Sequence, residues 1–149
     1  MILLHDPGGQ EVNPWRAPRG RIDVWWRGKQ NGPLMLLLAH LLVQNAAWSG
    51  RPIRLLRVVP SEEAVEDSKA HLTELLRQAR IRAQPRVVVD EDSLAAIKRT
   101  SANAAVTLLG FAPPGDGEAE EFLERTTQLL EGLGTTLLVH SNEAVELNV

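Results

Sequence analysis

The sequence predicts an α/β protein, a three-layer α/β/α sandwich around a mostly parallel sheet of five strands. Two observations carry this prediction. From residue 21 onward, short runs of β-branched and apolar residues alternate with longer segments of helical periodicity, and the strand runs are almost continuously apolar. This alternation is typical of a parallel sheet covered by helices on both faces. Right-handed crossovers then favour the strand order 3-2-1-4-5 of a doubly wound sheet.

The first half of this segment supplies two strands and two helices. Residues 22–26 are the first predicted strand. Residues 34–48 form a helix that is apolar around most of its circumference, so we expect neighbours to cover it on most sides. Residues 53–59 are the second strand, and a helix follows over residues 60–80. Its apolar residues recur at the helical period, with acidic residues in the first turns and arginines in the last, as the helix dipole favours.

The second half continues the alternation. Strands are expected at residues 84–89, 105–109 and 135–139, with helices at residues 93–98 and 118–130 between them. The last helix has one apolar side, which we expect to face the sheet. The residues of that side are Phe122, Leu123, Thr126, Leu129 and Leu130.

Two terminal segments are candidates for extra edge strands. Residues 2–4 are apolar and predict a short strand, and residues 7–18 after them are rich in Gly and Pro. We therefore assign residues 1–20 to an N-terminal edge strand and loop, and residues 21–149 to a single α/β domain. Alternating apolar and polar residues at 144–149 predict a further edge strand.

Composition and charge exclude several classes of function. The 149 residues include no Cys, which removes disulfides, thiolate zinc sites and cysteine nucleophiles. A net charge of −3 supplies no basic field, so we expect no nucleic-acid partner. The four His are scattered without metal-ligand spacing, so no metal site is expected. The longest apolar run, residues 34–43, is shorter than the roughly 20 residues that span a bilayer.

Candidate catalytic residues are few. Asp90 and Asp92 follow a predicted strand, at the edge of the sheet where α/β proteins bind ligands, so either carboxylate could hold a cation or act as a general base. The interpretation we favour is that one of them caps the next helix. No residue nearby supplies a nucleophile together with its base, and we predict that the chain is not an enzyme.

A turn with two glycines at residues 28–32 joins the first strand of the series to its helix, where many α/β proteins bind phosphate. Its sequence fits neither the P-loop pattern nor G-x-G-x-x-G. The layout resembles universal stress proteins, whose ATP-binding members place a glycine series after the fourth strand, and the glycines from Gly110 onward do not reproduce that series. A site for ATP, another nucleotide or an anion is the alternative hypothesis. Its residues would be Gly28, Lys29, Asn31, Gly32 and Gly110.

Asp23 is a charged residue inside the first predicted strand of the series. Alternation places Asp23 and Trp25 on one face of the strand and the other three residues of 22–26 on the opposite face. A carboxylate in a covered strand needs a partner, and the candidates are Arg21, Arg27 or a backbone N–H. We expect a paired carboxylate that organises the strand rather than a catalytic group.

The same strand carries a resemblance to a known family. The sequence Ile22-Asp23-Val24-Trp25-Trp26, the start of the next helix at residues 31–38 and the strand sequence Ile53-Arg54-Leu55-Leu56 are similar, in this order, to the cytosolic C-terminal domain of cation–chloride cotransporters. The resemblance covers residues 21–149. Further segments that match the family are residues 101–109, 122–124 and 137–139.

The resemblance implies a regulatory domain on the cytoplasmic face of the cell membrane, in a transporter from a prokaryotic branch of the family. Such a domain would be non-catalytic and without a cofactor, would form a homodimer, and would contact the transmembrane domain that moves chloride with potassium and/or sodium. His140-Ser141 and the last four residues depart from the family pattern, which bears on contacts made by the tail. The alternative function is a nucleotide-binding regulator similar to universal stress proteins.

Overall fold

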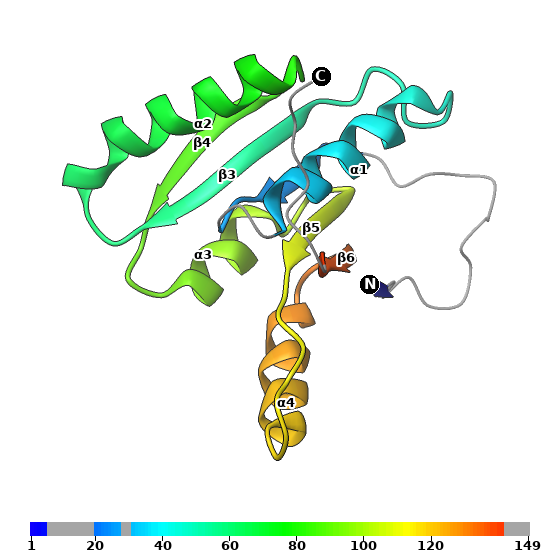
Figure 1. The fold of residues 1–149 in the computed structure, drawn as a ribbon, viewed down its shortest axis with the longest axis vertical. Helices are drawn as coiled ribbons and strands as arrows, with labels where there is room; N and C mark the ends of the chain where they lie inside the picture. The colour runs from blue at the N-terminus through cyan, green and yellow to red at the C-terminus, as the bar shows by residue number, and fades with distance from the viewer. Residues whose placement is uncertain (6–19, 28–30, 142–149) are drawn as a thin grey trace.

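The computed structural model describes residues 1–5, 20–27 and 31–141. The predicted strand at residues 144–149 lies outside the described residues. Within the described part of the chain, no helix is both long enough and apolar enough to cross a bilayer. The elements, shown in Figure 1, are β1 (Ile2–His5), β2 (Ile22–Trp25), α1 (Gly32–Gln44), β3 (Ile53–Val59), a 3₁₀ helix (Glu62–Ala64), α2 (Val65–Ala79), β4 (Gln84–Val89), α3 (Ser93–Thr100), β5 (Val106–Gly110), α4 (Ala119–Leu130) and β6 (Thr135–Val139).

One six-stranded sheet, in the order β1-β6-β5-β2-β3-β4, forms the centre of the fold. The strands β2 to β6 pair in parallel, and β1 pairs antiparallel with β6. The order of the five parallel strands confirms the predicted 3-2-1-4-5. The sheet has six strands rather than five because Ile2–His5 adds the expected N-terminal edge strand. The register places Asp23 beside Arg54 of β3 and Thr107 of β5.

The side chains of β2 and of Trp26, the residue after it, divide between two hydrophobic clusters, one on each face of the sheet. Val24 and Trp26 pack in a cluster with buried residues of α1 and α2. Trp25 packs in the other cluster, with Ile97 of α3 and Leu129 of α4. Helices therefore lie on both faces, which confirms the three-layer sandwich, and the two neighbouring tryptophans point into different layers as alternation predicts.

Helix α1 is covered around most of its circumference, as expected. Met35, Leu36 and Ala39 are buried, whereas Leu37 and Leu41 are 37% and 55% exposed. The remaining large apolar residues of the helix are half-buried and pack against the same hydrophobic cluster; they are Leu34, Leu38, Leu42 and Val43. The exposed apolar surface of α1 is therefore a narrow strip at Leu37 and Leu41.

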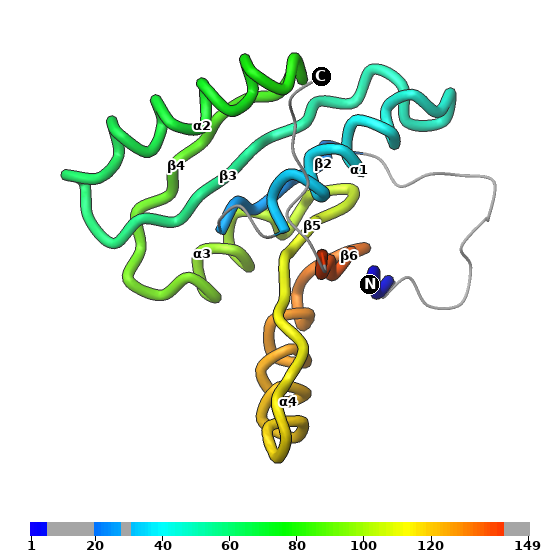
Figure 2. The backbone as a smooth tube through the Cα atoms, viewed as in Figure 1, coloured from blue at the N-terminus to red at the C-terminus, as the bar shows by residue number. Residues whose placement is uncertain are grey.

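Helix α4 and the segment before it form an arm that extends beyond the sheet (Figure 2). No residue of α4 is buried, and Leu123 is 66% exposed, so the prediction that Leu123 points inward is wrong. Phe122 packs on Phe111 with ring centroids 6.0 Å apart, and Leu129 reaches the hydrophobic cluster around Trp25. Residues 119–130 are helical as their periodicity predicts, but the helix packs on the core only near its C-terminal end.

Candidate functional site

A charged group is buried inside the sheet at Asp23, which is 0% exposed. Arg54 donates two hydrogen bonds to it, from Nε to Oδ1 and from Nη2 to Oδ2, both at 2.8 Å. Arg21 Nε donates to Oδ1 at 3.2 Å, and the hydroxyl of Ser101 donates to Oδ2 at 2.7 Å. Each carboxylate oxygen thus accepts two hydrogen bonds, so the buried charge is both paired and solvated by the protein.

These contacts extend to neighbouring groups. The indole Nε1 of Trp25 donates to the Ser101 hydroxyl at 2.9 Å. Arg21 and Arg54 each donate a hydrogen bond from Nη2 to the carbonyl oxygen of Thr100, at 2.8 and 3.1 Å. The network therefore fastens β2 and β3 to the turn after α3. We call it the Asp23 cluster, made of Arg21, Asp23, Trp25, Arg54 and Ser101.

The Asp23 cluster joins three segments that carry the family resemblance. Asp23 and Trp25 come from the strand at 22–26, Arg54 from the next strand, and Ser101 from the segment that precedes β5. Of the expected partners of Asp23, Arg21 is confirmed, while Arg27 makes no contact with it among the described residues. Arg54 and Ser101 were not predicted as partners, although both belong to segments already singled out. Because both carboxylate oxygens are occupied, the arrangement is that of a structural group.

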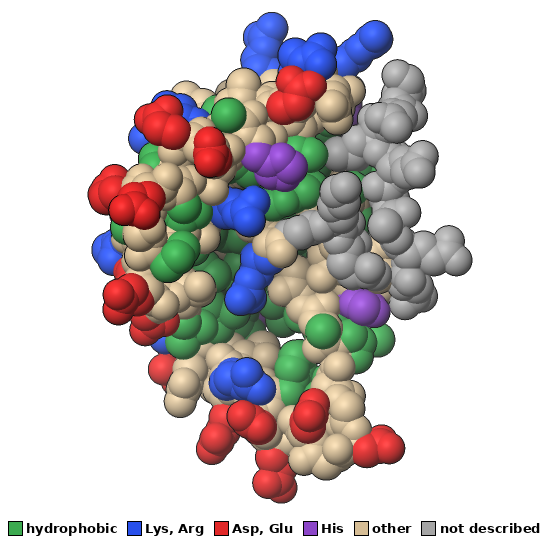
Figure 3. All heavy atoms as spheres, turned by 60° about the vertical axis from the view of Figure 1, so that its left-hand side comes forward, with side chains coloured by type: hydrophobic (Ala, Val, Ile, Leu, Met, Phe, Trp, Pro, Cys, Tyr) green, Lys and Arg blue, Asp and Glu red, His purple; other side chains and the backbone are tan. Residues whose placement is uncertain are grey.

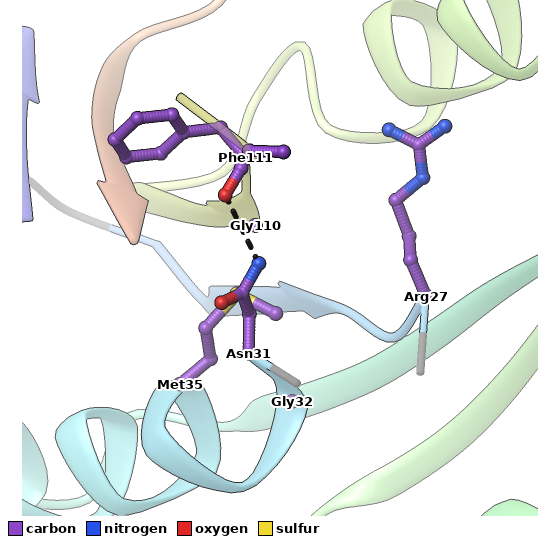
Figure 4. Close-up of a pocket in the computed structure, with 7 residues that line it drawn as sticks. Arg27, Asn31, Gly32, Met35, Gly110 and Phe111 are labelled. Atoms are coloured by element: carbon purple, nitrogen blue, oxygen red, sulfur yellow. Dashed lines mark hydrogen bonds between the residues drawn. The ribbon is translucent and has the colours of Figure 1, made fainter. Parts of the chain in front are cut away.

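The predicted nucleotide site lies where the strand order reverses, at the carboxyl ends of β2 and β5. Gly28 and Lys29 lie outside the described residues. Asn31, Gly32 and Gly110 come together around a pocket of about 220 Å³, which we call the switch-point pocket (Figure 4). This is the usual ligand position in a doubly wound sheet, but the volume is below the roughly 300 Å³ at which small-molecule sites begin. The other residues of the pocket are Arg27, Met35, Phe111 and Ala112.

Asn31 uses its side chain to hold elements of the fold together. Its Nδ2 donates to the carbonyl oxygen of Phe111 at 3.2 Å, the dashed line in Figure 4. Its Oδ1 accepts a hydrogen bond from the backbone N–H of Ser141 at 2.9 Å. The N-terminus of α1 is thereby tied to the ends of β5 and β6, and the oxygen and the nitrogen of the amide are both engaged within the protein.

The two glycines of the switch-point pocket are required by packing. A Cβ on Gly32 would lie 2.3 Å from the ring of Trp26, and a Cβ on Gly110 would lie 2.8 Å from the side-chain nitrogen of Asn31. Real Cβ atoms do not approach other atoms this closely, so a side chain at either position would displace its neighbour. The glycines are explained without a ligand.

The acidic turn before α3 caps the helix, as expected. Asp92 Oδ1 accepts hydrogen bonds from the backbone N–H groups of Leu94 at 3.0 Å and Ala95 at 3.2 Å. The pKa of Asp90 is lowered, first by the backbone N–H of Asp92 and then by the guanidinium of Arg99, which lies 3.0 Å from Oδ2. Across the described ranges, no three His, Asp or Glu side chains are placed to hold a metal ion.

The structure is that of a doubly wound α/β domain in which the residues of the Asp23 cluster stabilise the sheet. Comparison with known proteins identifies its family. The sequence model of solute carrier family 12 matches residues 14–129, most of the chain, so this chain belongs to solute carrier family 12. The resemblance that the sequence indicated is thereby confirmed.

Two relatives illustrate the family. Potassium/chloride cotransporter 3 of Caenorhabditis elegans is 36% identical over 66 residues, which are 44% of this chain and 6% of that protein. The crystal structure of the cytoplasmic domain of a prokaryotic cation chloride cotransporter superposes with a TM-score of 0.67 at 17% identity, covering 96% of this chain and 54% of that chain. The second likeness shows a shared fold. This chain thus spans a small part of the curated relative and about half of the solved domain.

Proposed function

We propose that this chain is a non-catalytic regulatory domain of a cation–chloride cotransporter, placed on the cytoplasmic face of the membrane. There it forms a homodimer and contacts the transmembrane domain. The observation that carries the proposal is the convergence of the family-like segments in the Asp23 cluster, within a chain whose residues 14–129 match solute carrier family 12. The residues that identify the family here maintain a rigid body rather than a reaction centre.

The engagement of the acidic groups supports a non-catalytic role. The carboxylate of Asp23 is fully buried and accepts four hydrogen bonds. Asp92 caps α3, and Asp90 is bound to Arg99 and to the backbone of its own turn. A general base needs an accessible lone pair within reach of a substrate proton. Both carboxylate oxygens of Asp23 and of Asp90 accept hydrogen bonds within the protein, and Oδ1 of Asp92 accepts the two hydrogen bonds of the helix cap.

A rigid body regulates a transporter by binding its conformations with different strength. The change in equilibrium between two transporter states equals the difference in contact free energy that the domain makes with each state. Exposed apolar side chains are the groups most suited to such contacts. They lie on the outer side of α1 at Leu37 and Leu41, on the α4 arm at Leu123, and along β1.

The test measures chloride-dependent rubidium uptake in cells that express the transporter served by this domain. Three forms are compared: the intact protein, an Asp23→Asn variant that disrupts the Asp23 cluster, and a Glu74→Gln variant that alters an exposed ion pair on α2. We expect uptake and dimer content, measured by analytical ultracentrifugation of the domain, to change with Asp23→Asn and to stay unchanged with Glu74→Gln. Equal uptake and equal dimer content in all three would contradict the proposal.

The alternative, a nucleotide-binding regulator, is favoured by one observation. Asn31, Gly32 and Gly110 line one pocket at the switch point of the sheet, where doubly wound sheets bind their ligands. Titration calorimetry with ATP and ADP tests it directly. Saturable heat at millimolar nucleotide, with a rise in the melting temperature, would support this function, and the absence of both would remove it.

A further inference from the structure

A second cavity lies at the carboxyl ends of β2 and β3 and shares Arg27 with the switch-point pocket. Its volume is about 180 Å³. Arg27 and Arg57 both line it, and we call it the Arg27–Arg57 cavity. Figure 4 shows the side chain of Arg27 standing apart from Asn31 and Gly110, although all three line the switch-point pocket. The described residues that line it are Trp25, Trp26, Arg27, Arg57, Val58, Ser93 and Ile97.

The two arginines of this cavity carry charge that the described protein does not neutralise. Arg27 is exposed and Arg57 is half-buried, and within residues 1–5, 20–27 and 31–141 neither forms a hydrogen bond or an ion pair. Arg54, on the same strand as Arg57, shows the contrast, since its guanidinium is bound to Asp23. Two guanidinium-bearing residues that share a cavity without an acidic partner are expected to attract an anion.

The rest of the cavity fits the same chemistry. Among the residues that the structure describes, no acidic one lines the cavity, and Ser93 at the start of α3 adds a hydroxyl. The neighbouring carboxylate, Asp92, is held by the backbone N–H groups that it caps. Figure 3 shows acidic side chains mainly around the edge of one face of the molecule, with basic side chains near a hollow in its middle.

We propose that the Arg27–Arg57 cavity binds a tetrahedral oxyanion of the phosphate class, held by the two guanidinium groups and the hydroxyl of Ser93. Arginine suits this role because its planar fork donates two parallel hydrogen bonds to one oxyanion. A volume of about 180 Å³ accommodates one such anion and is too small for a whole nucleotide. The site goes beyond the regulatory role proposed above, because it names a ligand.

The anion has two possible sources. It is either free inorganic phosphate or the terminal phosphate of a larger molecule. The remainder of a larger molecule would extend into a groove of about 700 Å³ between α3 and α4, which Arg27 also lines. This groove carries the apolar side chains of Leu94, Phe111 and Phe122 and the acidic side chains of Glu91, Asp92 and Glu118, so it favours an uncharged remainder. Both sources share the same contact chemistry at the arginines.

The experiment titrates the full chain with inorganic phosphate and, separately, with ATP, and follows binding by NMR chemical shifts at low ionic strength. Arg27→Gln and Arg57→Gln are compared with Arg86→Gln, a matched control on β4 that is exposed and lines none of the cavities described above. Because a hydrogen bond to a charged group is worth roughly 1.5–3 kcal/mol, we expect each test variant to lose about tenfold or more in affinity. The control should keep the affinity of the unmodified chain.

Each outcome has a defined meaning. If phosphate and ATP bind with similar affinity and both lose affinity in the test variants, the ligand is the free anion. If ATP binds much more tightly than phosphate and loses affinity in the same variants, the ligand is the larger molecule. Absence of saturable binding to either probe, or equal binding in Arg27→Gln, Arg57→Gln and Arg86→Gln, overturns the proposal. Melting curves establish whether each variant folds. If Arg57→Gln does not fold, the comparison of Arg27→Gln with Arg86→Gln decides the proposal. The rubidium uptake assay is separate, so failure here leaves the proposed function standing.

Discussion

Replacing Asp23 by Asn tests the structural role of the Asp23 cluster with the smallest possible change of shape. The substitution keeps the volume of the side chain and removes its negative charge. Arg54, with a side chain 15% exposed, and Arg21, 28% exposed, would then remain beside a neutral amide. The amide also presents an N–H₂ group where the carboxylate accepted hydrogen bonds from Ser101 or from an arginine.

The expected cost follows from the burial of the pair. Removing one partner of a buried ion pair typically costs about 3–5 kcal/mol, because the remaining charge is left without compensation. For a domain of this size, 1 kcal/mol lowers the melting temperature by about 2–4 °C, so Asp23→Asn should lower it by about 6–20 °C. Native domains are stable by about 5–15 kcal/mol, so the loss is a large fraction of the total.

The assay is thermal unfolding followed by circular dichroism or calorimetry, with Glu74→Gln as the control. Glu74 and Arg77 form a comparably short ion pair, at 2.6 Å, but both side chains are largely exposed, at 49% and 71%. Exposed pairs contribute little to stability, so the control should shift the melting temperature several-fold less. If Asp23→Asn shifts it no more than Glu74→Gln, the reasoning is refuted. A double variant with Arg54→Met should cost less than the sum of the two single changes, because the groups are coupled.

Two further predictions concern single positions. Gly32→Ala should destabilise the protein by about 1–3 kcal/mol, because the new Cβ would lie 2.3–2.7 Å from atoms of the Trp26 ring, and a lower melting temperature with altered tryptophan fluorescence would show it. The hydrogen bonds from Arg77 lower the pKa of Glu74 from 4.5 to about 2. Because the folded pKa is depressed, the contribution of this pair to stability is present above pH 4.5 and is lost as the pH falls through 2, and solvent screening keeps that contribution small because both side chains are exposed. A carbon-13 titration of the Glu74 carboxyl measures the pKa itself. Arg77→Gln should return that pKa toward its ordinary value, and an unchanged titration would contradict the assignment.

The parts of the fold that obey local rules could be predicted from the sequence. Strand alternation depends only on backbone geometry, so it placed Trp25 and Trp26 in opposite layers. The handedness of crossovers depends on strand twist, so it gave the order of the five parallel strands. The capping role of Asp92 is equally local, since the groups it binds are two and three residues away.

The parts that depend on long-range placement could not be predicted. Arg54 lies 31 positions from Asp23 in the sequence and Ser101 lies 78 positions from it, so their contacts require the register of β2 on β3 and the position of a turn. Leu123 shows the same limit for a helix. Periodicity identifies its apolar side, but only the path of the chain determines whether a sheet lies beneath it.

The α4 arm has a practical consequence for studying this domain. Leu123 lies on a helix without buried residues, and the chain has no cysteine of its own. A single Leu123→Cys substitution would therefore create a unique attachment point for a fluorophore or spin label, far from the tightly packed β2. Such a label would report the binding of another molecule to the arm. The buried residues that stabilise the domain would remain unmodified.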